Sequence, residues 1–207
     1  MNITQKLIFT SCLSFSLPVF ATVGGPQSIE VLGYEAKEQK VYLLKHYEDG
    51  RGRLPQLYYY QFKNNAHPNK LIQVNSLYIN PKTQKVDYDQ DDTHFKKELT
   101  KIKKRLQPLP TTHAKYHIAV NQKTVQRVPT WYDPKQKQSE FHYTYTVKNQ
   151  NFKSQQQQAT AYQEKLKITQ QFMIPQQNKV LVTVQYLGIP YETGYMIEDP
   201  VLLLPKK

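Results

Sequence analysis

The sequence predicts an all-β or β-rich α+β fold, in which antiparallel meander sheets pack in a sandwich-like arrangement with one amphipathic helix on a sheet. Three observations support this prediction. From Ile29 onward, apolar residues recur mainly with a period of two, the pattern of half-buried strands. Turn residues separate these segments at intervals of roughly ten residues. Only one segment, around residue 100, has apolar residues at helical spacing.

The first 21 residues are typical of a secretory signal peptide. Lys6 supplies a positive charge, residues 7–20 are mainly apolar, and Ala21 completes a small-x-small cleavage site. The apolar run is short and contains serines and Pro18, whereas a membrane-spanning helix needs about 20 mostly apolar residues. We therefore expect cleavage of residues 1–21 and a periplasmic or secreted chain of residues 22–207. Cys12 is the only cysteine, so this chain would contain none.

Residues 22–207 are expected to form a single β-rich domain whose first part, residues 22–80, is a four-stranded meander. The expected strands are residues 28–34, 40–47, 56–63 and 71–78. Short polar or glycine-containing stretches separate the first three strands, and a turn containing Pro68 precedes the fourth. A meander of this size must bury one face against another part of the chain.

Residues 87–107 are predicted to form an acidic turn followed by the helix. Phe95, Leu99, Ile102 and Leu106 lie at spacings of four, three and four residues, which places them on one helical face. The acidic cluster at residues 91–92 suits a helix N-terminus, where carboxylates accept backbone N–H groups. Pro108 and Pro110 are expected to end the helix.

Residues 111–207 are predicted to form a second antiparallel part. A hairpin is expected from residues 115–120 and 124–128, turning at Asn121 and Gln122, and residues 139–148 alternate most regularly. Residues 149–158 are predicted as a polar exposed loop, followed by a short helix over residues 159–164. The remaining expected strands are residues 166–174, 180–187 and 194–204.

The charge of the chain favours an anionic partner. The formal net charge is +12, and Lys6 is the only charged residue of residues 1–21, so residues 22–207 carry +11. A basic surface attracts polyanions or acidic membranes, although high charge also serves solubility. The predicted polyanion-binding residues lie on the helix and point away from its apolar stripe: Lys96, Lys97, Lys101, Lys103, Lys104 and Arg105. The alternative is that these cations form an ordinary solvated face.

No cofactor is expected, but one segment has the spacing of a calcium site. Asp87, Asp89, Asp91 and Glu98 occupy positions 1, 3, 5 and 12 of a loop that resembles an EF-hand. Position 6 is Asp92, where that loop requires glycine for its sharp turn. The alternative reading is an acidic turn that caps the helix, with no calcium ion bound.

Signatures of catalysis are sparse. There is no Gly-x-Ser-x-Gly motif, no cysteine nucleophile after residue 21 and no glycine-rich phosphate loop. His113 and His117 share a face at i, i+4 spacing and, with Asp87 and Asp89, define the alternative of a metal-assisted hydrolase. Glu198 and Asp199 are adjacent on an expected strand, so they point to opposite faces and cannot flank one bond.

Aromatic residues gather near two predicted turns, in residues 131–132 and 186–195. They would suit either a sugar-stacking shelf or the packing of hairpin ends.

We therefore predict an exported, non-enzymatic bacterial envelope or secreted protein. It would bind an anionic envelope polymer or a protein partner through a cationic, tyrosine-rich surface, since the chain has 16 tyrosines. The alternatives are the metal-assisted periplasmic hydrolase and a structural or accessory subunit of an envelope assembly. No sequence-specific nucleic-acid binding and no membrane span in residues 22–207 are expected.

Overall fold

The computed structural model describes residues 24–63 and 69–206, so the predicted signal segment and Cys12 lie outside the described residues. The fold is β-rich, and its described part has one α-helix, α1 (Asp92–Lys103), and one 3-10 turn, η1 (Ser76–Tyr78). The strands are β1 (Gln27–Glu35), β2 (Lys40–Tyr47), β3 (Gln56–Gln61), β4 (Leu71–Gln73), β5 (His117–Pro129), β6 (Lys137–Lys148), β7 (Phe152–Ser154), β8 (Gln157–Ala161), β9 (Lys167–Ile174), β10 (Lys179–Ile189) and β11 (Tyr195–Pro205).

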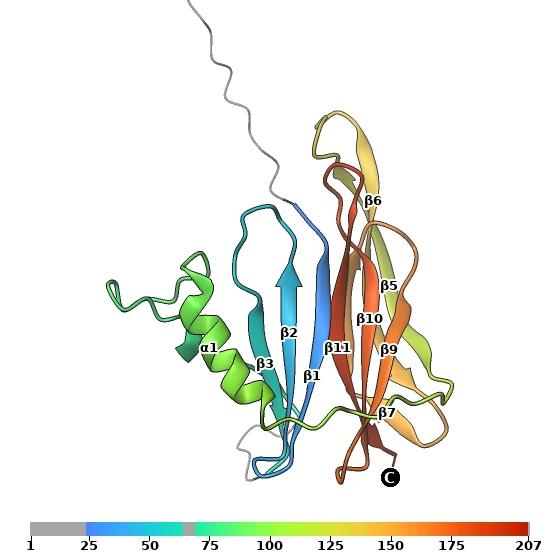
Figure 1. The fold of residues 1–207 in the computed structure, drawn as a ribbon. Coiled ribbons are helices and arrows are strands. Elements are labelled where there is room, and N and C mark those ends of the chain that lie inside the picture. The colour runs from blue at the N-terminus through green and yellow to red at the C-terminus, as the bar shows by residue number, and fades with distance from the viewer. Residues whose placement is uncertain (1–23, 64–68, 207) are drawn as a thin grey trace, which may run out of the picture.

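The strands form a curled sheet of mixed direction (Figure 1). The first four strands pair in sequence order as the predicted meander, and α1 lies along one side of them. The C-terminal strand β11 joins the two parts of the chain. It pairs in parallel with β1 at Ile197 and antiparallel with β10 and β7, while β6 connects β7 and β8 to the outermost strand β5.

Three clusters of buried side chains form the core between α1 and the different parts of the curled sheet. The first lies between α1 and the meander and includes Tyr42, Leu57 and Phe95. The second lies between the meander and strands β9 to β11 and includes Leu43 and Leu181. The third packs β6 and β8 against the other face of β10 and β11. The alternation of side chains along each strand supplies both faces, so β2 and β10 each contribute to two clusters.

The predicted helix is confirmed, with its end slightly earlier than expected. Asp91 caps it, since its carboxylate accepts the Thr93 N–H at 2.9 Å. After α1, the Gln107 backbone exchanges two hydrogen bonds with Tyr34 of β1, at 2.8 and 2.9 Å. Gly33 allows this close approach because it has φ of +140° and a Cβ there would lie 2.6 Å from the Gln107 carbonyl oxygen.

The predicted fourth strand, residues 71–78, is too long. Only β4 is extended, and the chain then turns through η1. The reason is the buried Tyr78, whose hydroxyl donates to the Pro55 carbonyl at 2.6 Å and accepts the Leu57 N–H at 2.7 Å. These bonds hold the segment against the meander, so it does not continue the ladder.

The predicted hairpin turning at Asn121 and Gln122 is wrong. Residues 117–129 form one continuous strand, β5, which pairs with β6 along its length, and the register shifts between Val120 and Gln122. A β-bulge thus takes the place of the expected turn, because β6 is long enough to pair with both expected strands.

The predicted loop over residues 149–158 and helix over residues 159–164 are also wrong in large part. The chain makes a short turn and returns as β7, then continues as β8 beside β6. The Ser154 hydroxyl accepts the Val147 N–H at 2.9 Å and so takes part in the pairing. Alternate β8 residues, Ala159 and Ala161, are buried in the third cluster, while Gln158 and Thr160 are exposed.

Within the described residues, we find no helix of the length and apolarity needed to cross a membrane.

Candidate functional site

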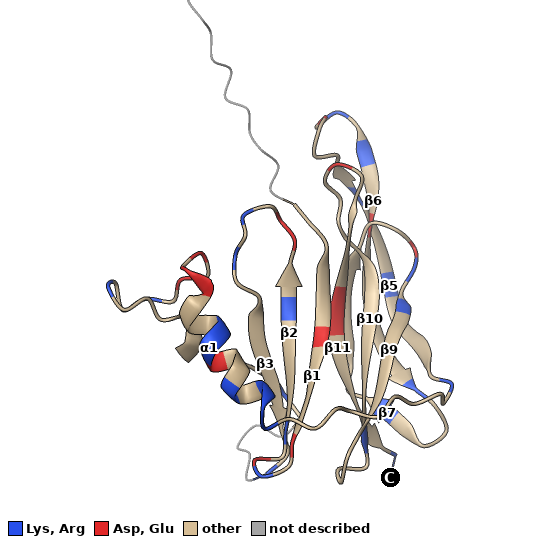
Figure 2. Ribbon diagram, in the orientation of Figure 1, with Lys and Arg blue, Asp and Glu red and all other residues tan. Residues whose placement is uncertain are grey.

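Most of the helix cations that were predicted to bind a polyanion form ion pairs with acidic residues of the chain itself. Four of the six form ion pairs: Lys96 with Asp92 (2.6 Å), Lys101 with Glu98 (2.6 Å), Lys103 with Glu30 (3.0 Å) and Arg105 with Glu35 (3.1 Å). Lys97 and Lys104 have no ion pair with the described residues. Figure 2 shows acidic and basic segments interleaved on α1. Much of the positive charge of this helix is therefore neutralised by its neighbours.

The acidic residues of the calcium-like spacing are not brought together. The Asp87 carboxylate accepts the Asn80 side-chain amide at 2.9 Å and the Asp89 N–H at 3.0 Å, and these hydrogen bonds lower the pKa of Asp87. Asp91 caps α1, and Glu98 pairs with a lysine one turn further on. These contacts match the capping alternative.

The two histidines belong to a different part of the chain from this acidic turn. His113 is exposed in the segment before β5, and His117 is the first residue of β5, opposite Lys148. The described residues contain no group of three or more His, Cys, Asp or Glu side chains placed to hold a metal ion. The metal-assisted hydrolase therefore gains no assembled site from this part of the chain.

The aromatic residues near the two turns divide into a buried and an exposed set. Tyr186 is buried in the third cluster. Trp131, Tyr132 and Tyr191 are exposed, and Trp131 makes edge-on contacts with the other two rings at 5.5 and 6.4 Å between centroids. This cluster lies where β5 and β10 end, and β5 separates it from His117.

A different group of basic residues has no ion pair with the described acidic residues. His117, Lys148 and Lys153 are directly opposite one another on β5, β6 and β7, and we call these three residues the basic ladder. Directly opposite residues share a face of the sheet, about 5 Å apart. None of the three forms an ion pair with any described acidic residue, and Figure 2 shows basic segments around β7.

Two further lysines lie near the basic ladder, next to the turn between β6 and β7. Lys115 lies with His117 beside residues 149–151, and the backbone N–H of Lys206 donates to the Asn151 carbonyl at 2.8 Å. Like charges that lie directly opposite each other on neighbouring strands are destabilising. An anionic ligand would remove this repulsion.

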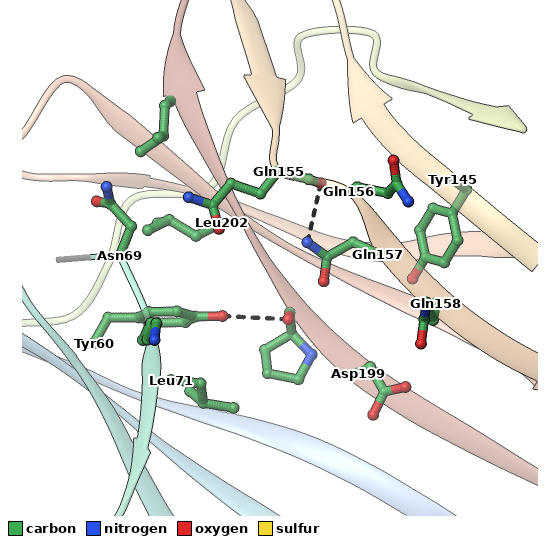
Figure 3. Close-up of a pocket in the computed structure, with 13 residues that line it drawn as sticks. Tyr60, Asn69, Leu71, Tyr145, Gln155, Gln156, Gln157, Gln158, Asp199 and Leu202 are labelled. Carbon is green, nitrogen blue, oxygen red and sulfur yellow. Dashed lines mark hydrogen bonds between the residues drawn. The ribbon is translucent and has the colours of Figure 1, made fainter. Parts of the chain in front are cut away.

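A cavity of about 470 Å³ adjoins the basic ladder. The ladder row continues onto β11, because Lys153 is directly opposite Leu204, and Leu204 lines the cavity. The cavity lies beside the part of β11 between Ile197, which pairs with β1, and Leu203, where pairing with β7 begins. There the Tyr60 hydroxyl donates a hydrogen bond to the Pro200 carbonyl at 3.3 Å, as the backbone of a neighbouring strand would do (Figure 3).

The cavity wall is polar. Its lining residues are Tyr60, Asn69, Lys70, Leu71, Tyr145, Gln155, Gln156, Gln157, Gln158, Asp199, Pro200, Leu202 and Leu204. Asp199 supplies its carboxylate, which is fixed by the Lys45 ammonium at 3.1 Å and the Tyr186 hydroxyl at 2.5 Å. Four consecutive glutamines add amide donors and acceptors on the opposite side (Figure 3).

The tyrosine hydroxyls around Asp199 remain protonated. Burial, and secondarily the negative charge of Asp199, raises the pKa of Tyr60, Tyr145 and Tyr186. Two of these hydroxyls already donate to protein acceptors. Tyr145 is 1 % exposed, yet its hydroxyl has no hydrogen-bond partner among the described residues and lines the cavity.

Sequence reasoning missed this site for two reasons. It placed Lys148 at the end of a predicted strand and Lys153 within a predicted loop, although a hairpin turn over residues 149–151 would have set them opposite each other. It considered Asp199 only as a partner of Glu198. The two carboxylates do diverge, as predicted: Glu198 is buried at the β1–β11 junction and Asp199 lines the cavity.

Comparison of the chain with protein-family models, curated proteins and solved structures found no match. Any function for this chain is therefore inferred from its sequence and its structure.

Proposed function

We propose that this chain is an exported, non-enzymatic protein that binds an anionic polymer of the bacterial envelope. The observation that carries the proposal is the basic ladder, His117, Lys148 and Lys153, which lies in one row and forms no ion pair with the acidic residues that the structure describes. This row replaces α1 as the favoured binding surface, because ion pairs occupy most cations of the helix.

The lysines of the basic ladder carry positive charge that no described acidic residue neutralises through an ion pair. Neighbouring strands are about 4.8 Å apart, so the row from His117 to Leu204 spans roughly 14 Å, long enough to contact several charges of an extended polymer. The net charge of +11 for residues 22–207 would speed association with a polyanion at low ionic strength. Export remains part of the proposal and rests on residues 1–21.

The test compares two double variants with the same change of net charge. Polyphosphate binding is measured for the protein, for Lys148→Gln/Lys153→Gln, and for Lys96→Gln/Lys101→Gln as the control. We expect affinity to fall with rising salt. The ladder variant should bind about tenfold more weakly at low salt and show a shallower salt dependence, whereas the helix variant should bind nearly as the parent does.

Equal weakening by both variants would mean that net charge alone attracts the polymer, and absence of binding would also refute the proposal. The structural-subunit alternative makes a different prediction, namely a stable complex with an envelope protein that survives high salt.

A further inference from the structure

We infer that the cavity beside Asp199 binds a neutral sugar unit of an anionic glycan whose acidic units lie on the basic ladder. This inference rests on the proposed function and identifies the class of polymer. It follows from what lines the cavity, how the cavity joins the ladder, and which hydroxyl is left without a partner.

The lining matches a polyhydroxylated ligand. The Asp199 carboxylate is held in place by Lys45 and Tyr186, and it is one-third exposed, so lone pairs remain to accept hydroxyl protons. The amides of Gln156 and Gln158 have no hydrogen bond to other described residues and can both donate and accept. A sugar ring offers hydroxyls that are donors and acceptors in the same way. The volume of about 470 Å³ falls within the range of small-molecule pockets.

Tyr145 is the sharpest indicator of a ligand. Its side chain is almost wholly buried, and its hydroxyl lines the cavity with no hydrogen bond to the described residues (Figure 3). The hydroxyl is not one of the fully buried side-chain atoms left without a hydrogen bond in the described part of the chain, so it is open to the cavity and within reach of a ligand. A bound hydroxyl or ring oxygen would supply the missing hydrogen bond.

Continuity with the basic ladder indicates that the ligand is charged outside the cavity. Leu204 lines the cavity and lies directly opposite Lys153, so the row continues through Lys148 to His117 on the same face. Within the cavity, Asp199 would repel an acidic unit. The arrangement therefore favours a glycan in which neutral sugars alternate with acidic ones.

The test uses two oligomers with three carboxylates each. A hyaluronan hexasaccharide alternates acidic and neutral sugars, and a capped Glu-Gly-Glu-Gly-Glu-Gly peptide carries the same charge without sugar hydroxyls. Titration calorimetry at low salt is run with the protein, with Tyr145→Phe, and with Tyr132→Phe as the control, because Tyr132 lies in the distant aromatic cluster. Tyr145→Phe should leave stability unchanged, since its hydroxyl bonds to no described residue.

We expect the hexasaccharide to bind more tightly than the peptide, and Tyr145→Phe to weaken only the hexasaccharide, by about fivefold. Tyr132→Phe should change neither affinity. The inference is overturned if both oligomers bind equally, if Tyr145→Phe has no effect, or if it weakens the peptide as much as the glycan, which would assign the cavity to a peptide.

The Lys148→Gln/Lys153→Gln variant separates the two proposals. If it weakens both oligomers while Tyr145→Phe weakens neither, the ladder binds polyanions and the cavity inference fails alone. If hexasaccharide binding depends on Tyr145 but not on the ladder lysines, the proposed function fails and the sugar site stands. Failure of both oligomers to bind refutes both.

Discussion

At the scale of single residues, the buried carboxylate Glu198 fastens the N-terminal strand to the C-terminal one. It accepts the Ile29 N–H at 2.9 Å, the Thr183 hydroxyl at 2.5 Å, the Gln170 amide at 3.2 Å and the Thr169 hydroxyl. Burial raises the pKa of Glu198, but these hydrogen bonds outweigh burial, so the pKa lies below its ordinary value of 4.5. The group is therefore charged at neutral pH.

We predict that Glu198→Gln lowers the free energy of unfolding by about 2–3 kcal/mol at pH 7, because an amide N–H would face a donor in the same cage. The folded-state pKa is lowered, so the contribution of Glu198 is present above about pH 4.5 and is lost as the pH falls through the folded-state value. Urea unfolding at pH 7 and pH 3 measures both effects. A difference between the two proteins that is equally large at pH 3 would contradict this assignment.

At the scale of elements, Arg105 attaches the end of α1 to the meander, although its sequence position suggested a ligand-binding role. Its guanidinium lies 3.1 Å from Glu35, whose side chain is 8 % exposed and whose second oxygen has no hydrogen bond to any residue in the described ranges. Burial, followed by the charge of Glu35, raises the pKa of Tyr42 to about 12. Loss of Arg105 would leave a buried carboxylate without a counter-charge.

We predict that Arg105→Met lowers the free energy of unfolding by about 1–3 kcal/mol at neutral pH. Lys97→Met is the matched control, since Lys97 is exposed, lies on α1 close in sequence to Arg105 and has no ion pair with the described residues, so its effect should stay below about 0.5 kcal/mol. Chemical denaturation of the three proteins gives the comparison. Equal stability of the two variants would show that the Glu35 pair contributes nothing.

At the scale of the whole molecule, the meander and the C-terminal strands share one core. Val41 and Leu43 of β2 pack in the same cluster as Leu181 of β10 and Leu202 of β11, and all four are nearly inaccessible to solvent. The meander has a second face covered by α1, but this first face depends on strands that follow it by more than 100 residues.

We predict that a fragment of residues 24–110 does not fold by itself, because it would expose the Val41 and Leu43 face. Two-dimensional NMR of the fragment should show the narrow shift dispersion of an unfolded chain, whereas the same residues in the whole protein give dispersed strand signals. A dispersed spectrum for the isolated fragment would mean that the chain contains two independent units.

Much of the fold could be predicted from local patterns. The alternation in β2, β6 and β10 and the stripe from Phe95 to Leu106 gave the strands and helix nearly in place. The errors at Asn121 and at residues 149–164 share a cause. Polar strands such as β5 and β8 are held by backbone pairing with β6, and such pairing does not require an apolar alternation in the strand that is added.

The sequence by itself determined the β-rich class, the single amphipathic helix, the excess positive charge and the divergence of Glu198 from Asp199, because each depends on residue order within one element. Only the tertiary structure decided which charges matter. Ion pairs with β1 neutralise cations of α1, whereas the turn after β6 sets Lys148 against Lys153. The cavity at Asp199 exists because β11 changes partners from β1 to β7, and such an exchange between distant strands is decided by packing of the whole chain.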